Sequence, residues 1–257
     1  MFINATEITS AEIVSDNPIH QRLLFAYEAA QNYIQGDLLE IGCGEGRGVE
    51  LLVQQAVSYT AIDKIATVVD KLKVKYPNVA LLNMLVPPFT GIADNTYDRI
   101  VTFQVIEHIE EDDFFVKEIY RVLKPGGLAI ITTPNIKMSL TRNPWHVREY
   151  TRMELETLLT KYFPKVQMEG VYGSQRVNDY YERNKESVQK YKRLDIFNLE
   201  QRLPRKVLQF PYNILNRINR NSLHKSNDSL VADIHTRDYC LKIADDTCYD
   251  FFCLAYK

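Results

Sequence analysis

Residues 40–48 combine one carboxylate with closely spaced glycines, a pattern suited to holding a small ligand against the main chain. The apolar run 38–41 contains Glu40 and is followed by glycines at positions 42, 44, 46 and 48. Glycine permits backbone angles that a side chain would forbid, and it lets a ligand approach the main chain closely. The spacing fails the dinucleotide pattern G-x-G-x-x-G because Arg47 occupies the third glycine position, and the Gly-Lys-Ser/Thr of a P-loop is absent.

A second carboxylate follows the next apolar run. Residues 57–62 have strand-like composition and end at Asp63, about twenty residues beyond the glycine turn. A carboxylate at the tip of a second parallel strand can accept hydrogen bonds from both hydroxyls of a ribose. The alternative is that Asp63 only caps a helix or forms a turn.

These residues resemble motif I of the class I S-adenosylmethionine (SAM) dependent methyltransferases, Glu40-x-Gly42-x-Gly44-x-Gly46. The stretch from Phe103 to Asn135 is similar to the ubiquinone/menaquinone-type, or type 11-like, branch, and the resemblance covers roughly residues 19–170. It implies SAM as the cofactor and no metal.

The resemblance also assigns cofactor contacts. It places Glu40, Gly42, Cys43 and Gly44 on the methionine side of SAM and Asp63 on the ribose. It puts Lys64 or Ile65 beside the adenine and the main chain of Gln104 near the amino group or sulfur.

One position departs from the family pattern. Many relatives carry an Asp before a Pro-Phe pair, where it binds the adenine amino group, but residues 82–89 contain no carboxylate. The side chain of Asn83 or the main chain of Met84 is expected to replace it.

Methyl transfer from a sulfonium depends mainly on proximity and orientation, and a general base helps only when the nucleophile carries a proton of high pKa. The candidates for a base or substrate contact are His108, His146 and Tyr150, with Arg148 and Glu149 beside them. Glu107 and His108 could instead brace the loop after their strand. Residues 143–150 are expected to arch over the pocket or to form a packed loop anchored by Trp145 and Tyr150.

The expected elements alternate between strand and helix. An early helix over 18–34 carries His20 and Arg22, and Arg22 could pair with the SAM carboxylate or form a surface ion pair. Apolar periodicity and the capping box of Thr151 and Glu154 predict the remaining elements. Strands are expected at 37–41, 57–62, 79–83, 98–103, 127–132, 166–172 and 248–256, and helices at 46–56, 65–75, 111–123 and 151–161. The fold class is α/β, a Rossmann-like, doubly wound, mostly parallel seven-stranded sheet whose last strand is antiparallel.

A basic segment, 174–230, interrupts this core before the last strand and is expected to form a helical insertion or lid. Residues 174–227 carry twelve Lys and Arg against five Asp and Glu. Helical spacing is plausible over 178–197 and 203–218, although Pro204 and Pro211 argue against one continuous helix in the second range. The insertion could be a structural flap or a dimer contact, or it could face an acidic substrate or an anionic membrane through 203–220.

Composition places few other limits on function. The chain has 257 residues with 46% hydrophobic and 25% charged residues, as expected for a single globular domain over 1–257. The net charge of −2 gives no general attraction to nucleic acid. The N-terminus lacks the features of an export signal and no apolar run reaches the ~20 residues of a membrane span. Four cysteines without a C-x-x-C pair favour a reducing cytoplasm, and the protein is expected to be a monomer or homodimer.

The function expected from the resemblance is methyl transfer from SAM to a small molecule or a glycan precursor. One alternative is a methyltransferase for a lipid-linked or macromolecular acidic substrate. The other is a SAM-fold protein that binds without catalysis, against which Glu40, the glycines and Asp63 argue.

Overall fold

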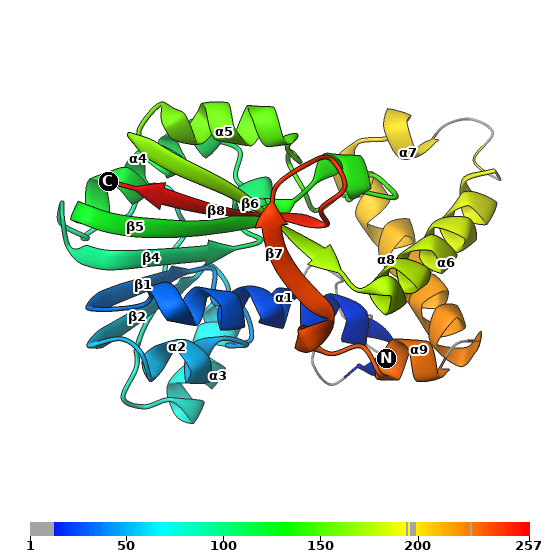
Figure 1. Cartoon of the computed structure of the whole chain (residues 1–257), viewed down its shortest axis with the longest axis horizontal. Helices are drawn as coiled ribbons and strands as arrows, with labels where there is room; N and C mark the ends of the chain where they lie inside the picture. The colour runs from blue at the N-terminus through cyan, green and yellow to red at the C-terminus, as the bar shows by residue number, and fades with distance from the viewer. Residues whose placement is uncertain (1–12, 194, 196–198, 227) are drawn as a thin grey trace.

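The computed structural model describes residues 13–193, 195, 199–226 and 228–257 (Figure 1). The N-terminal residues for which no export signal is predicted lie outside this part of the chain. A central eight-stranded sheet has the order β3-β2-β1-β4-β5-β8-β6-β7. The strands are β1 (Asp37–Ile41), β2 (Ser58–Asp63), β3 (Ala80–Asn83), β4 (Tyr97–Phe103), β5 (Leu123–Pro134), β6 (Lys165–Gly173), β7 (Tyr239–Ile243) and β8 (Asp250–Tyr256).

Helices cover both faces of the sheet and one of its ends. They are α1 (Asn17–Ala30), α2 (Val49–Val53), α3 (Ala66–Lys75), α4 (Asp112–Val122), α5 (Arg152–Thr160), α6 (Gln175–Lys192), α7 (Leu199–Arg202), α8 (Arg205–Ser226) and α9 (Asp228–Ala232). Buried side chains of α1, α2 and α3 share one hydrophobic cluster, and those of α4 and α5 share another. Burial of strands on both sides explains the nearly continuous apolar runs in the sequence.

The chain reverses direction across the sheet after β3. Strands β1, β2 and β3 pair in parallel toward one edge, and β4 then pairs in parallel with the other side of β1. In open sheets of this type, ligands bind at the carboxyl ends of the strands beside such a switch point. The glycine turn after β1 therefore lies where the topology places a ligand site.

The predicted fold class is confirmed, with β8 inserted antiparallel between β5 and β6. The sheet nevertheless has eight strands rather than seven, because β7 adds an antiparallel edge strand beside β6. Only Tyr239 of this strand is buried, so its sequence has no alternating apolar pattern to reveal it.

The described residues of 174–230 form a layer of helices at one end of the sheet, which we call the cap (Figure 1). The expectation that Pro211 would interrupt the second helical range is wrong, since α8 continues through it. Proline removes the hydrogen bond to the carbonyl four residues earlier, here that of Val207. Both residues are exposed, so solvent can satisfy that carbonyl. The end of the first predicted range, 178–197, falls partly outside the described residues.

Among the helices described for this chain, none is both long and apolar enough to cross a bilayer.

Candidate functional site

The glycine turn is held against the neighbouring strand by its own main chain. The amides of Gly42 and Cys43 donate to the carbonyl of Ile62, at 2.8 and 3.1 Å. Gly42 has φ +79°, and a Cβ there would lie 2.3 Å from a methyl carbon of Val105. The turn after β1 and the segment after β4 therefore approach more closely than any residue but glycine allows.

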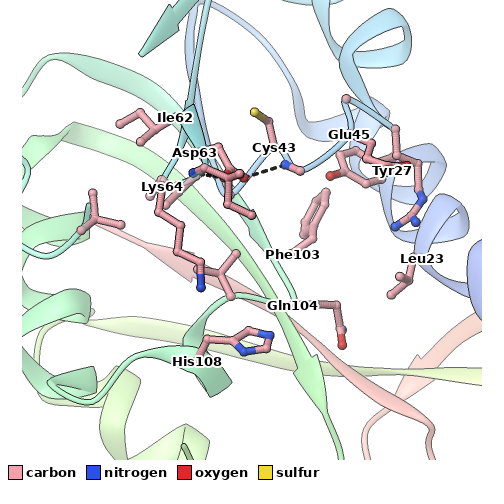
Figure 2. A pocket seen from close by; sticks show the side chains of 18 of the residues that line it. Leu23, Tyr27, Cys43, Glu45, Ile62, Asp63, Lys64, Phe103, Gln104 and His108 are labelled. Atoms are coloured by element: carbon pink, nitrogen blue, oxygen red, sulfur yellow. Dashed lines mark hydrogen bonds between the residues drawn. The ribbon is translucent and has the colours of Figure 1, made fainter. Parts of the chain in front are cut away.

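Asp63, at the tip of β2, accepts hydrogen bonds from this turn and from its own following residues. One carboxylate oxygen accepts from the amide of Gly44 at 2.9 Å, and the other accepts from the amide of Ile65 at 2.8 Å. Each oxygen retains a second lone pair. The carboxylate can therefore accept further hydrogen bonds from a ligand in the cavity that it borders (Figure 2).

A cavity of about 530 Å³, the cofactor cavity, opens at these strand tips. Its wall includes most of the predicted cofactor contacts: Gly42, Cys43, Gly44, Asp63, Lys64, Ile65, Met84 and Gln104. Figure 2 shows labelled side chains around it from α1, from the tips of β1 and β2, and from the segment after β4. The predicted residues thus converge on one hollow.

Two predicted contacts lie outside this wall. The carboxylate of Glu40 is buried and accepts hydrogen bonds from the hydroxyls of Tyr27, at 2.7 Å, and of Tyr59. Burial raises the pKa of Glu40. Asn83 donates its side-chain amide to the carbonyl of Asp63 at 3.0 Å. The buried Glu40 supports the wall from behind, and the side-chain nitrogen of Asn83 is engaged by the main chain of Asp63.

The wall also contains residues that sequence reasoning missed as site residues. Arg47 and His20 line it, with Nε of Arg47 donating to Nδ1 of His20 at 3.2 Å. Burial lowers the pKa of Arg47. Tyr27 also lines the cavity and links it to Glu40. The sequence offers one sign that Arg47 lines the cavity, because it is a basic residue within the glycine turn. Nothing in the sequence near Tyr27 indicates that this residue lines the cavity.

Gln104 has a backbone conformation that is uncommon for a residue with a side chain. Its φ is +58°, and its amide donates to the carbonyl of Thr132 at 2.9 Å. Backbone outliers of this kind cluster at ligand sites, where surrounding structure holds them. The conformation bends the chain at the tip of β4 so that Gln104 and His108 both border the cofactor cavity.

The three catalytic candidates separate in space. Tyr150 is fully buried, and its hydroxyl donates to Asp112 at 2.8 Å. Burial raises its pKa well above the ordinary value. His108 borders the cofactor cavity, and His146 borders a second cavity described below. The structure therefore gives Tyr150 the role of anchoring the loop, which was the alternative prediction for this segment.

His108 and His146 meet edge to face, with ring centroids 4.9 Å apart. His108 Nδ1 lies 2.9 Å from the carbonyl of Trp145, to which it must donate. Asn143 uses its oxygen to accept from the amide of Trp145, so its nitrogen donates to Nε2 of His146 at 2.8 Å. Nδ1 of His146 then carries the hydrogen and donates to Glu149 at 2.6 Å. These partners place the hydrogen of the His146 ring on Nδ1 and a lone pair on Nε2.

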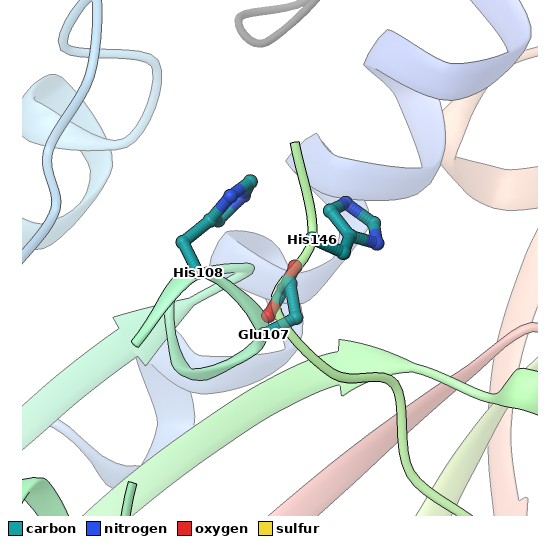
Figure 3. A group of neighbouring side chains, drawn as sticks. All are labelled: Glu107, His108 and His146. Atoms are coloured by element: carbon teal, nitrogen blue, oxygen red, sulfur yellow. The ribbon is translucent and has the colours of Figure 1, made fainter. Parts of the chain in front are cut away.

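Glu107 lies beside this pair (Figure 3). One of its carboxylate oxygens accepts from Thr133 at 2.9 Å, and the other is buried without a partner. Burial raises the pKa of Glu107 to about 7. Glu107, His108 and His146 form the one cluster of potential metal ligands found among the described residues. Because both nitrogens of His146 are engaged, binding a metal would require this network to rearrange. The prediction that no metal is used stays a prediction.

The second cavity, of about 210 Å³, lies between the sheet and the cap, and we call it the cap cavity. Its wall is mainly aromatic and polar. Tyrosines and asparagines reach it from five segments: Asn135, Asn143, Tyr180, Tyr181, Asn184, Tyr212, Asn216, Asn219, Tyr239 and Tyr249. Because His108 and His146 touch, the histidine pair marks the boundary between the two cavities.

Arg22 lines the cap cavity and does not border the cofactor cavity. It pairs with the buried carboxylate of Asp250, Nε to oxygen, at 2.9 Å. Neither expectation for Arg22 describes this arrangement, because its partner is a buried residue of β8.

Three arginines of α8 also have partners on the core. Arg217 and Arg220 both donate to the buried carboxylate of Asp16, at 2.9 and 3.0 Å. Arg205 lies 3.3 Å from Glu110. These three cations therefore attach the cap to the core, and the possible membrane contact through 203–220 stays a prediction.

Comparisons with known proteins agree with this architecture. Residues 39–131 match the family of methyltransferase domains. The chain is similar to a probable S-adenosylmethionine-dependent methyltransferase of Mycolicibacterium smegmatis, with 35% identity over 161 residues, 60% of this chain and 62% of the relative. A ubiquinone biosynthesis O-methyltransferase of Rickettsia bellii is 31% identical over 125 residues, 46% of this chain and 51% of the relative. The chain thus spans less than two thirds of the length of these relatives.

Two solved structures share the fold over most of their length. A SAM-dependent methyltransferase of Thermotoga maritima has a TM-score of 0.57 at 14% identity, covering 93% of this chain and 91% of that one. A SAM-dependent methyltransferase of Archaeoglobus fulgidus has a TM-score of 0.54 at 15% identity, covering 90% and 92%.

A doubly wound sheet with a glycine turn and a carboxylate at its switch point is a Rossmann-like arrangement, and the two solved methyltransferase structures share this fold. The family match over residues 39–131 and the named relatives make the chain similar to the type 11 branch of the SAM-dependent methyltransferases. SAM is the cofactor that this family indicates for the cofactor cavity.

Proposed function

We propose that the protein binds SAM in the cofactor cavity and transfers its methyl group to an acceptor held in the cap cavity. The observation that carries this proposal is the contact between His108 and His146, which joins a cavity of cofactor type to a separate polar cavity. Transfer requires the sulfonium and the nucleophile to be brought into line at close range. The boundary between the cavities is where the two reactants would meet.

In this proposal Asp63 binds the ribose hydroxyls and the main chain around Gly42 and Gly44 faces the methionine portion of SAM. Met84 borders the adenine. Arg47 supplies a cation in the same wall, where the SAM carboxylate would neutralise it. Glu40 acts indirectly by holding Tyr27 and Tyr59.

We assign the role of general base to His146. Its Nε2 bears the lone pair, and Glu149 on Nδ1 both fixes the ring and stabilises the imidazolium formed by proton uptake. An acceptor hydroxyl would replace Asn143 at Nε2. A base of this kind is needed for a hydroxyl nucleophile of high pKa.

The acceptor class that we favour is a small molecule or glycan precursor, because tyrosine faces and asparagine amides suit a hydroxylated, neutral ligand. A lipid-linked acceptor is the second candidate. It is favoured by the similarity to enzymes named for ubiquinone biosynthesis.

Calorimetry with S-adenosylhomocysteine and NAD tests the cofactor assignment. We expect S-adenosylhomocysteine to bind and NAD not to bind, and the reverse would refute the proposal. The acceptor side is tested with radiolabelled SAM and a panel of hydroxylated acceptors. His146→Asn should lower turnover by about 10²–10⁴-fold and leave the affinity for S-adenosylhomocysteine within a few-fold, whereas equal turnover would exclude His146 as the base.

A further inference from the structure

The cap cavity adjoins a groove on the surface. This groove, of about 700 Å³, runs along α6 beside β7 and the segment after β5. Groove and cavity share part of their walls, and the shared residues are Met138, Ser139, Leu140, Tyr181, Val188 and Tyr249. The two hollows are therefore immediate neighbours, with these side chains between them.

The charges of the groove are strongly biased. Four lysines line it, Lys137, Lys185, Lys192 and Lys242, against a single acidic residue, Glu182. Lys185 lies 3.2 Å from Glu182, and Lys192 lies 3.3 Å from Glu200. Lys137 and Lys242 make no ion pair with any acidic side chain in the part of the chain that the structure describes.

The inner cavity has the opposite character. Its two arginines are already neutralised, Arg22 by the buried Asp250 and Arg220 by the buried Asp16. Its remaining polar groups are mainly hydroxyls and amides. A ligand that matches both regions has a neutral part in the cap cavity and an anionic part in the groove.

We propose that the groove binds a phosphate or similar anionic group of the acceptor, while the hydroxylated end of the acceptor enters the cap cavity. This inference rests on the proposed function for the identity of the ligand as acceptor. The anion would lie against Lys137 and Lys242. Lys242 is positioned by the ring of Tyr172, with its Nζ 5.5 Å from the ring centroid.

The test uses inorganic pyrophosphate as the probe and the full chain saturated with S-adenosylhomocysteine. Calorimetry at low salt should detect binding that weakens as salt is added. The double variant Lys137→Gln/Lys242→Gln should bind pyrophosphate about tenfold more weakly, roughly threefold for each exposed cation removed. The matched control is Lys161→Gln/Lys165→Gln, which removes one lysine after α5 and one at the start of β6, both outside the groove, and should bind like the wild type.

Absence of pyrophosphate binding, or equal binding by the two double variants, would overturn the inference. This test can fail separately from the proposed function. If the protein does not bind S-adenosylhomocysteine but still binds pyrophosphate through the two lysines, the proposed function is refuted and the anion site in the groove is supported.

The anion could belong to a lipid head group or to a soluble phosphorylated compound. Two experiments distinguish these sources. One measures whether the protein sediments with vesicles that contain phosphatidic acid. The other titrates glucose 1-phosphate and follows the fluorescence of the single tryptophan, Trp145. Lysine-dependent sedimentation identifies a lipid head group. Lysine-dependent quenching without sedimentation identifies a soluble phosphate, and either result supports the groove.

Discussion

Replacing Glu107 by glutamine should change how the stability of the protein depends on pH. The carboxylate is buried, with Thr133 as the partner of one oxygen and no partner for the other. Ionisation under these conditions costs desolvation energy that a single hydrogen bond does not offset. Glutamine keeps nearly the same shape and can still accept from Thr133, but it carries no charge at any pH.

The size of the effect follows from the pKa. Burial raises the pKa of Glu107 from 4.5 to about 7, so the folded protein holds a proton that the unfolded chain has already released. The stabilisation from this proton is present below pH 4.5 and is lost as the pH rises through 7. The shift corresponds to roughly 3 kcal/mol. The variant lacks this contribution, so the wild type should lose roughly 3 kcal/mol relative to Glu107→Gln between pH 4.5 and pH 8.

Urea denaturation of both proteins, followed by circular dichroism from pH 4.5 to pH 8, measures this difference. Glu40 and Asp250 also have pKa values raised by burial, but both proteins retain them, so their effects cancel in the comparison. Parallel stability curves would refute the reasoning, because they would mean that Glu107 ionises in the folded state as easily as in the unfolded chain.

Three further substitutions test other parts of the site. Asp63→Ala should weaken the binding free energy of S-adenosylhomocysteine by about 1.5–3 kcal/mol for each charged hydrogen bond to the ligand. Calorimetry on the folded variant measures this, and an unchanged affinity would mean that Asp63 only stabilises the turn. Gly48→Ala would place a Cβ 1.8 Å from a ring carbon of Tyr27. Urea denaturation should therefore show a free energy of unfolding lower by about 1–3 kcal/mol or more. Wild-type stability would show that α1 and the glycine turn can move apart at little cost. Tyr150→Phe removes the hydrogen bond to Asp112 and should lower the free energy of unfolding by about 1–2 kcal/mol. Calorimetry should show an unchanged affinity for S-adenosylhomocysteine, and weaker binding would contradict the placement of Tyr150 outside the cofactor cavity.

Local chemistry made the cofactor half of the molecule predictable. The bounds of β1 agree with the prediction from its apolar run, and Thr151 and Glu154 form the expected reciprocal cap of α5. Asp63 lies where the length of the preceding strand placed it. Each of these features depends on residues close together in the chain, so the periodicity, the glycines and the capping residues carry the information directly.

Contacts between distant segments were not predictable in this way. Arg22 pairs with Asp250, and Arg217 and Arg220 pair with Asp16, although each pair joins opposite ends of the chain. Spacing in the sequence has no relation to such pairs, because the order of strands in the sheet decides which ends meet. The same reason hid the burial of Glu40, whose partner Tyr27 belongs to a helix predicted only by its apolar face.

The separation of the two cavities explains why the comparisons identify a cofactor and leave the acceptor open. The family match over residues 39–131 includes nearly the whole wall of the cofactor cavity, except for side chains of α1 such as His20 and Tyr27. It includes no residue that lines the cap cavity. SAM presents the same chemistry to every member of the family, so one local pattern suffices to bind it. The proposed acceptor side is built from α1, the end of β5 and the loop after it, the cap, the start of β7 and the residue before β8. Differences in those segments can change the acceptor without altering the pattern that marks the family.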